Sequence, residues 1–416
     1  MFIREIIKNK NLRNGSLFVV YSFLNQGLNF LLMIVLSWYI LPASFGKLNL
    51  YYTGINILSV FICLCTSGFI NINFYRVNRE RLCRYINVTL ICTAVVSVVL
   101  LFCIILFNYW IEKYSGIEFR MQFLCVFTCA TSVLYVILTN IYRLEEKVIS
   151  YGFVTIISTI LNISTTLFLV IVLSWDWYGR AASNALISFL FFLVAIYFLR
   201  RKGYLMFIKP SKEDYKESLA YGVPLIPHSI NGWLRQGVDR YVINGFFSAT
   251  QVGLFSFSIT FSTIIYTIGI AFNQSNSAYI FKVLSKDPDG IKKQLRKQTL
   301  LMIAFFGVVT LLLNILCVVL FPFAFPKYQS AIIYLFPLSM GAFFQCIYLQ
   351  FCNYIFYFKK TKQLMYMTFS VSIIHMSLSL FLTQYSVVLT AYVSMISSFI
   401  EALLVFLYSR KLYKVL

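Results

Sequence analysis

The chain has 416 residues, of which 60% are hydrophobic and only 12% are charged, and its mean hydropathy is +0.80. A soluble domain needs about 25% charged residues to cover its surface, so the composition excludes one. The net charge of +21 would suggest nucleic acid in a soluble chain, but here the basic residues lie at the ends of long apolar runs, next to lipid headgroups. We therefore predict an all-α, polytopic membrane protein with no nucleic-acid partner.

About twelve apolar segments follow one another along the chain. Each is long enough to cross a hydrocarbon core of about 30 Å as a helix. They are expected near residues 17–40, 48–73, 86–110, 121–142, 150–174, 181–199, 218–246, 251–279, 300–320, 331–356, 364–383 and 387–408. The first is too long for a signal-peptide core, so we expect an uncleaved span.

The basic residues alternate between the two predicted sides of the membrane. Of the 35 Lys and Arg residues, 28 lie on the side of both termini and two lie within the seventh span. The remaining five are Lys47, Lys113, Arg120, Arg180 and Lys327, which we place on the opposite side. By the positive-inside rule, both termini should be cytoplasmic.

The long basic connection at 200–217 divides the chain into equal parts. The predicted parts are an N-terminal six-helix bundle at 1–199, a cytoplasmic linker at 200–217 and a C-terminal six-helix bundle at 218–416. Because each half has an even number of spans, any repeat should be parallel. A weak repeat at an offset of 207 residues matches Gly46 with Gly253 and aligns the first span with the seventh. We predict two bundles around a central cavity.

Ten cysteines occur, mostly within the spans and none in a predicted external loop. A disulfide framework is therefore not expected. Cys125 and Cys129 lie one helical turn apart, but without His or acidic partners, so no metal site is predicted.

The seventh span carries most of the intramembrane charge. At 100° per residue one stripe contains Tyr221, Pro224, His228, Asn231, Arg235 and Asp239, with Gln236 and Arg240 beside it. A charge at the centre of a span costs about 2.5–3.5 kcal/mol, so the stripe should face protein or a water-filled cavity. Alternatively, Arg235 and Asp239 form an i,i+4 pair that neutralises itself, but the second arginine then leaves net positive charge. The prolines predict a kink in this span.

Other spans carry uncharged polar stripes. They fit either hydrogen bonding between close-packed helices or a polar, positively biased cavity between the halves. Such a cavity would suit a diphosphate flanked by sugars, because Arg forks bind phosphate and amides bind hydroxyls. The candidate substrate contacts are Arg235, Arg240, His228, Asn231, Asn25, Gln26 and Asn29. The candidates for ion coupling are Asp239, Glu401 and His375, although Glu401 could simply snorkel or accept a hydrogen bond.

The segment YGVPLIPHSINGWLRQGVDRYVINGFF, followed by VGLFSFSIT, resembles bacterial polysaccharide-export flippases, the O-antigen translocases called Wzx. The first span and its loop, NQGLNFLLMIVLSWYILPASFGKLNLYYT, fit the opening of the same family. These proteins belong to a superfamily that includes multidrug and toxic compound extruders. The resemblance implies ion-coupled, alternating-access transfer of undecaprenyl-diphosphate-linked oligosaccharide across the inner membrane. It also implies that Arg235 and Arg240 meet the diphosphate, with Asp239 beside them.

The resemblance implies no cofactor. The expected partners are the lipid bilayer and the polymerase and chain-length proteins of the same pathway. One alternative is a drug or small-solute antiporter, which is disfavoured because the first span lacks the acidic coupling residue of drug extruders. The other is an enzyme of polysaccharide assembly. A polymerase typically has a large external loop, which is missing, and an acyltransferase needs a reactive histidine. We expect both His228 and His375 to be buried without an obvious partner, and no Walker loop occurs. The prediction is a transporter with no catalytic residues.

Overall fold

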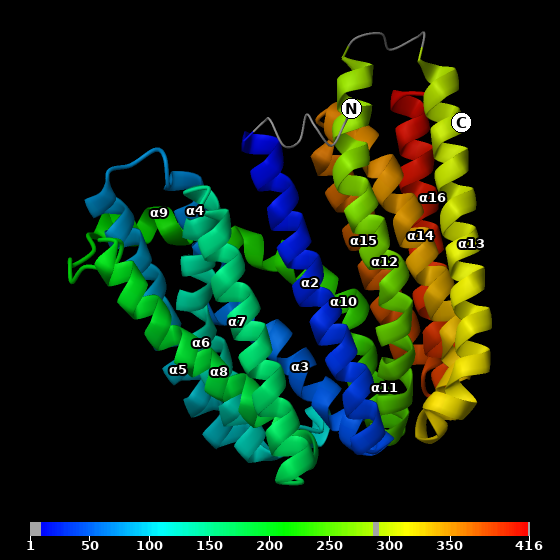
Figure 1. The fold of residues 1–416 in the computed structure, drawn as a ribbon, viewed down its shortest axis with the longest axis horizontal. Coiled ribbons are helices and arrows are strands. Elements are labelled where there is room, and N and C mark those ends of the chain that lie inside the picture. The colour runs from blue at the N-terminus through cyan, green and yellow to red at the C-terminus, as the bar shows by residue number, and fades with distance from the viewer. Residues whose placement is uncertain (1–9, 286–290, 415–416) are drawn as a thin grey trace. The chain divides into compact units, whose positions relative to one another are not determined.

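The computed structural model describes residues 10–285 and 291–414, and within those ranges the chain is helical with no strand (Figure 1). Ten described helices are long and apolar enough to cross a membrane. An eleventh span is possible where α3 (Pro42–Ile62) and α4 meet at a bend of 55°. This confirms the prediction of an all-α, multi-pass membrane protein.

Two compact units form, with the boundary between Trp233 and Leu234. The first contains α2 (Lys10–Tyr39), most of α3, α4 (Thr66–Asn73), α5 (Arg79–Ser115), α6 (Phe119–Leu144), α7 (Val148–Leu167), a π-helical turn (Phe168–Val172), α8 (Asp176–Arg201), α9 (Lys212–Gly222), a 3-10 turn (Val223–Leu225) and most of α10 (Ile226–Gln236). The second contains Leu41–Gly46, α11 (Val238–Phe246), α12 (Ala249–Leu284), α13 (Lys292–Ala324), a 3-10 turn (Pro326–Ala331), α14 (Ile332–Tyr357), α15 (Thr361–Leu382) and α16 (Val387–Leu412).

This boundary lies inside the predicted seventh span, whereas the sequence suggested the linker at 200–217. The reason is that α9 is held on the first unit. Asp214 forms an ion pair with Arg84 of α5 at 3.0 Å, and Glu217 forms one with Arg81 of the same helix at 2.9 Å. Gly222 lies against the carbonyl of Leu64, where a Cβ would collide. The division into two six-helix bundles around a central cavity stays a prediction.

The predicted seventh span is not one continuous helix. Pro224 lies in the 3-10 turn between α9 and α10, which confirms the predicted kink, because proline lacks an N–H for the helical ladder. A second break follows at Gly237, between α10 and α11. These breaks, together with the bend between α3 and α4, explain why ten continuous spans and not twelve are found in the described ranges.

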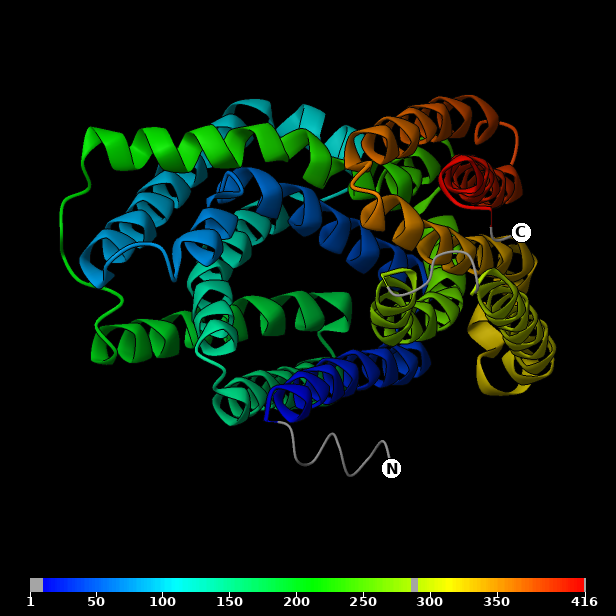
Figure 2. The same cartoon turned by 90° about the horizontal axis from the view of Figure 1, so that it is seen from above.

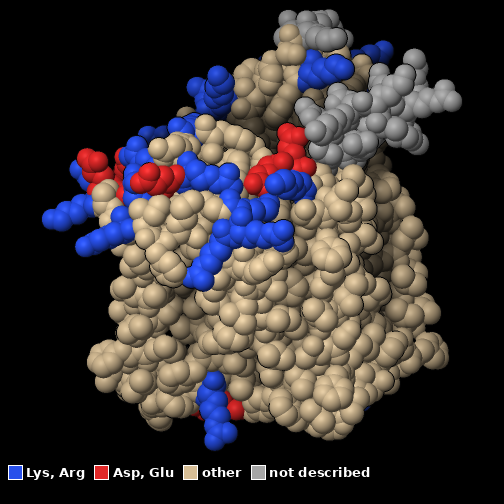
Figure 3. All heavy atoms as spheres, turned by 60° about the vertical axis from the view of Figure 1, so that its left-hand side comes forward, with Lys and Arg blue, Asp and Glu red and all other residues tan. Residues whose placement is uncertain are grey.

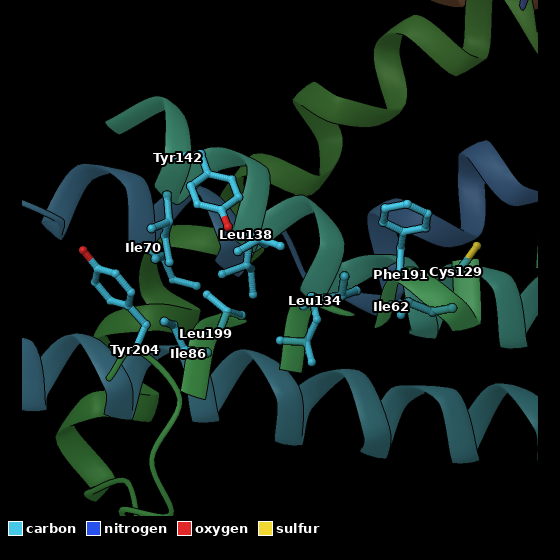
Figure 4. Packing of buried hydrophobic residues seen from close by; sticks show 14 of the residues in the cluster. Ile62, Ile70, Ile86, Cys129, Leu134, Leu138, Tyr142, Phe191, Leu199 and Tyr204 are labelled. Atoms are coloured by element: carbon cyan, nitrogen blue, oxygen red, sulfur yellow. The ribbon is translucent and has the colours of Figure 1, made fainter. Parts of the chain in front are cut away.

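The core of the first unit runs along α5, α6 and α8 (Figure 4). Leu134 and Leu138 of α6 lie among Ile86, Phe191 and other fully buried apolar side chains. Lipid tails are as apolar as this core, so burial of these side chains gives little hydrophobic driving force in the membrane. The helices are held together instead by close van der Waals packing.

Charged side chains gather at one end of these helices and leave the surface beyond them almost uncharged (Figure 3). At this end, here called the basic end, Glu145 accepts bonds from Lys202 at 2.6 Å and Tyr204 at 2.7 Å, and pairs with Lys147 at 3.0 Å. The guanidinium of Arg79 lies 3.7 Å from the Tyr204 ring centroid. Burial would raise the pKa of Glu145, but the bonds from Lys202, Tyr204 and Lys147 outweigh it, so the pKa lies below its usual value.

In the second unit, α16 packs against α14 and α15, and α14 packs against α12 (Figure 2). The start of α3 also reaches α12. A Cβ added to Gly253 would collide with the carbonyl of Pro42, and one added to Gly46 with that of Ala249. The two glycines that the weak repeat aligned therefore touch each other. Only glycine lets two backbones approach this closely.

Candidate functional site

A cluster of buried polar side chains lies in the second unit. Its central residue, Asp239, is on the first turn of α11 and is 2% exposed. One carboxylate oxygen accepts from Nε2 of His375 at 3.1 Å and from the Ser379 hydroxyl at 2.6 Å. The other oxygen accepts from the Ser394 hydroxyl at 3.0 Å. Three donors from α15 and α16 therefore replace the water that a buried carboxylate loses.

The ring of His375 is itself held at both nitrogens. Nδ1 lies 3.2 Å from the Ser397 hydroxyl, opposite the contact to Asp239. A neutral imidazole with its proton on Nε2 donates to Asp239 and accepts from Ser397, so one tautomer satisfies both contacts. A second proton on this ring would turn the contact into an ion pair. The expectation that His375 is buried without a partner is therefore wrong in its second part.

Arg235, near the end of α10, forms an ion pair with Glu401 of α16. Glu401 is 1% exposed, and it also accepts from the Gln345 amide at 2.8 Å. Arg235 donates in addition to the Ser398 hydroxyl at 3.3 Å. The alternative of an i,i+4 pair between Arg235 and Asp239 is therefore wrong, because each side chain has its partner on another helix. Glu401 therefore accepts hydrogen bonds inside the protein and does not snorkel to the surface, while its role in ion coupling stays a prediction.

The remaining cation of the predicted stripe is Arg240. Its Nε donates to the Ser256 hydroxyl at 3.0 Å, and a terminal nitrogen donates to the Gln236 carbonyl at 2.7 Å. Among the residues that the structure describes, no carboxylate pairs with it directly. With Asp239 and Glu401 ionised and His375 neutral, the formal charges of the two arginines are balanced. Glu401 therefore offsets part of the positive charge that the two arginines bring to this cluster. The positively biased cavity between the halves stays a prediction.

A cavity of about 140 Å³ opens between these side chains. Its polar lining includes Arg235, Asp239, His375, Gln345 and Ser394. One water occupies about 30 Å³ in the liquid, so this volume suits a few waters or a small ion. Sites for drug-sized ligands take about 300–1,000 Å³, so this cavity alone is too small for a diphosphate flanked by sugars.

Five of the predicted contact residues lie in the first unit. His228 is exposed, so the expectation of a buried histidine is wrong at this position, and Gln26 and Asn29 are exposed as well. Asn25 and Asn231 are half-buried, and each has a buried amide oxygen without a hydrogen-bond partner. Unsatisfied acceptors of this kind could serve sugar hydroxyls. That these residues face Arg235 stays a prediction.

One buried cation was missed. Arg180, placed in an external connection by the sequence, lies in α8 and is 7% exposed. It donates to the side chains of Asn162 and Thr166 on α7, at 3.0 Å for Thr166, and its guanidinium lies 5.7 Å from the Tyr52 ring centroid. A signal was available, because Asn162 and Thr166 are four apart and mark one face of the preceding span.

Four uncharged polar residues of the cluster were missed as well: Ser394 and Gln345, which bond the two carboxylates, and Ser397 and Ser398, which bond His375 and Arg235. Ser394, Ser397 and Ser398 lie on α16 near Glu401. A serine stripe at helical spacing around a glutamate within a span was the signal for a shared polar site. No comparable sequence pattern marks Gln345 of α14 as part of this site.

The chain is similar to two proteins of one bacterium and, in fold, to solved transporter structures. It is 23% identical to an uncharacterized membrane protein of Haemophilus influenzae over 88% of each chain, and 24% identical to Lsg locus putative protein 1 of the same organism over 85% of this chain and 86% of that one. Its fold is similar to that of the lipid II flippase MurJ in an inward closed conformation, with a TM-score of 0.76, 15% identity and coverage of 94% and 87%.

It is also similar to an inward-facing multidrug resistance MATE family transporter of the MOP superfamily, with a TM-score of 0.70, 16% identity and coverage of 93% and 94%. These likenesses show that the chain has the fold of MOP superfamily transporters. A family model described as polysaccharide biosynthesis protein matches residues 11–275, which is more than half of the chain. The chain therefore belongs to the polysaccharide biosynthesis protein family of multi-pass membrane proteins.

Proposed function

We propose that this protein is a flippase that moves undecaprenyl-diphosphate-linked oligosaccharide from the cytoplasmic to the periplasmic leaflet of a bacterial inner membrane. The observation that carries the proposal is the buried cluster of two carboxylates, two arginines and a histidine in a protein of this family. Charges inside a membrane protein are costly and mark ion or substrate pathways. Both termini are cytoplasmic in this proposal.

The ion-coupling step falls to Asp239 and His375. In the neutral tautomer described above, His375 donates to Asp239, and a proton that enters the 140 Å³ cavity can bind either group. The cluster then gains one positive charge, which favours an anion nearby. A cation other than the proton would use the Asp239 oxygens together with the hydroxyls of Ser379 and Ser394.

The arginines take the diphosphate. Glu401 occupies Arg235 in this state, so the substrate must compete with a buried carboxylate or bind after Glu401 takes up a proton. Arg240 has no direct carboxylate partner among the described residues, so it can bind a phosphate without first breaking an ion pair. Because the formal charges of the cluster are balanced, a diphosphate would be compensated by cation uptake. This links substrate binding to ion binding, which is what a coupled transporter requires.

A drug or small-solute antiporter is the second candidate, and the similarity to a multidrug transporter fold favours it. Against it, the first span has no acidic residue. Catalysis in polysaccharide assembly is a weaker alternative. Polymerase and chain-length proteins are expected partners of the flippase.

Purified protein in vesicles tests the proposal. A fluorescent polyprenyl-diphosphate oligosaccharide is placed in one leaflet, and its transfer is followed by enzymatic access from outside, with and without a proton or sodium gradient. We expect gradient-dependent transfer that is lost in Asp239→Asn. Transfer of cationic drugs without transfer of the lipid-linked sugar would favour the antiporter instead.

A further inference from the structure

A second and larger cavity lies in the first unit, away from the Asp239 cluster. It has a volume of about 400 Å³, within the range of ligand-binding sites. The cavity is bordered by α5, α6, α8 and the segment after α8, and α6 packs against both α5 and α8. Most of its lining is apolar, as at Leu90, Leu134 and Phe192. This lining fits a hydrocarbon chain.

Two buried hydroxyls in the cavity wall lack a partner. Thr93 and Ser97, one turn apart on α5, are each more than nine-tenths buried, and neither hydroxyl has a hydrogen-bond partner. Thr131, another hydroxyl of the wall, does have a partner, because it bonds Ser188 at 2.9 Å. A buried hydroxyl without a partner costs about 1–3 kcal/mol, so an occupant that supplies an acceptor is favoured.

The mouth of the cavity is cationic. Arg200, at the basic end of α8, lies 4.8 Å from the ring centroid of Phe207, which is 95% exposed. No acidic side chain pairs with Arg200 in the described ranges. The amide of Asn87 donates to the carbonyls of Met206 and Ile208, each at 2.8 Å, and ties this segment to α5. The mouth is therefore a fixed structure with an arginine free to meet an anion.

We propose that this cavity binds one glycerophospholipid from the leaflet at the basic end. Its phosphate would meet Arg200, its ester carbonyls would accept from Thr93 and Ser97, and an acyl chain would fill the apolar part. From Asn87 to Ser97 the cavity follows α5 for about 15 Å at helical rise, which matches a headgroup with the start of its chain. A polyprenyl tail fits less well, because it offers the two hydroxyls no acceptor. The site is independent of the proposed transport.

The test uses purified full-length protein in vesicles of phosphatidylethanolamine and phosphatidylglycerol. A trace of phosphatidylglycerol with a photoactivatable diazirine on one acyl chain is added, and cross-linked residues are mapped by mass spectrometry. We expect cross-links in residues 87–97 and 192–207. Ala130→Trp, which fills the cavity, should abolish them, while Val99→Trp, on an exposed part of α5 outside the lining, should not.

Three further variants, with one matched control, test the proposal if the tryptophan disturbs folding. Replacement of Thr93 by Val and Ser97 by Ala should each lower cross-linking roughly fivefold, as the loss of one hydrogen bond does. Arg200→Ala should lower it as well, whereas its exposed neighbour Arg201→Ala should not. Equal cross-linking in Ala130→Trp and wild type would overturn the proposal. So would displacement of the phospholipid by polyprenyl phosphate at equal concentration.

Discussion

The ion pair of Arg235 and Glu401 allows the sharpest test of the candidate site. Glu401 is 1% exposed and its side chain is held by Arg235 and Gln345, while the Arg235 side chain is 15% exposed. Removal of one member of a buried pair leaves the other charge uncompensated, at a cost of about 3–5 kcal/mol. We therefore expect Arg235→Gln to destabilise the protein by about that amount, and Glu401→Gln by less, because Arg235 lines the cavity and its side chain is partly exposed.

The double variant separates pairing from two independent effects. If the two side chains are partners, Arg235→Gln with Glu401→Gln should regain much of the lost stability, with a coupling energy of about 0.5–3 kcal/mol. Unfolding in detergent, followed by size-exclusion fluorescence after heating, measures this cycle. Stability losses that simply add up would refute the pairing.

Transport distinguishes a substrate contact from a structural pair. The double variant should be stable but should not move lipid-linked sugar, because a diphosphate needs the fork of donors that only arginine provides. Arg235→Lys should keep the charge and retain part of the transport rate. Exposed Arg201→Ala is the matched control and should change neither quantity. Full transport by the stable double variant would remove Arg235 from the substrate site.

Three other predictions follow. Asp239→Asn should keep normal abundance and lose transport, because asparagine retains hydrogen bonds but holds no charge; a fall in abundance with unchanged specific activity, measured by quantified immunoblot and vesicle transport, would make the role structural. At the basic end, the pKa of Glu145 is lowered, so its pairing should stabilise the protein at neutral pH and be lost as pH falls below the usual carboxyl range. Glu145→Gln should therefore flatten the acid limb of melting temperature against pH, and an unchanged limb would contradict this. Reporters fused after Lys209 should be cytoplasmic and those after Gln384 external; a periplasmic signal at 209 would overturn the orientation.

Most of the membrane helices could be predicted from the sequence, and so could the charged residues that lie within them. Hydropathy located the membrane helices, and the cost of intramembrane charge singled out Arg235, Asp239, Arg240 and Glu401 before any contact was known. Hydropathy could not show that the seventh segment is broken twice. Pro224 signalled the first break, but a single glycine, Gly237, is too common within membrane helices to signal the second.

The partners of these charged side chains could not be predicted from the sequence, and the reason is physical. Periodicity orders the side chains of one helix, so it put Arg235 and Asp239 on the same stripe and made them natural partners. Their actual partners, Glu401 and His375, are 166 and 136 residues away, on α16 and α15. Only the packing of helices decides such choices. The same limit explains Arg180, whose hydrogen bonds lie on the neighbouring α7.

The ion pair of Arg235 with Glu401 leaves the set of candidate site residues unchanged, but it changes the charge that a substrate would meet there. A cavity with two unpaired arginines would hold a diphosphate tightly and release it slowly. Every 1.4 kcal/mol of added binding free energy lowers the dissociation constant about tenfold. A cluster with balanced charges binds the anion only when a carboxylate is protonated, when a cation is bound or when Arg235 leaves Glu401. In the transport cycle that we propose, loss of that cation or proton would restore the balance and favour release of the substrate. Buried carboxylates beside the arginines therefore suit a carrier that must release its cargo better than arginines alone would.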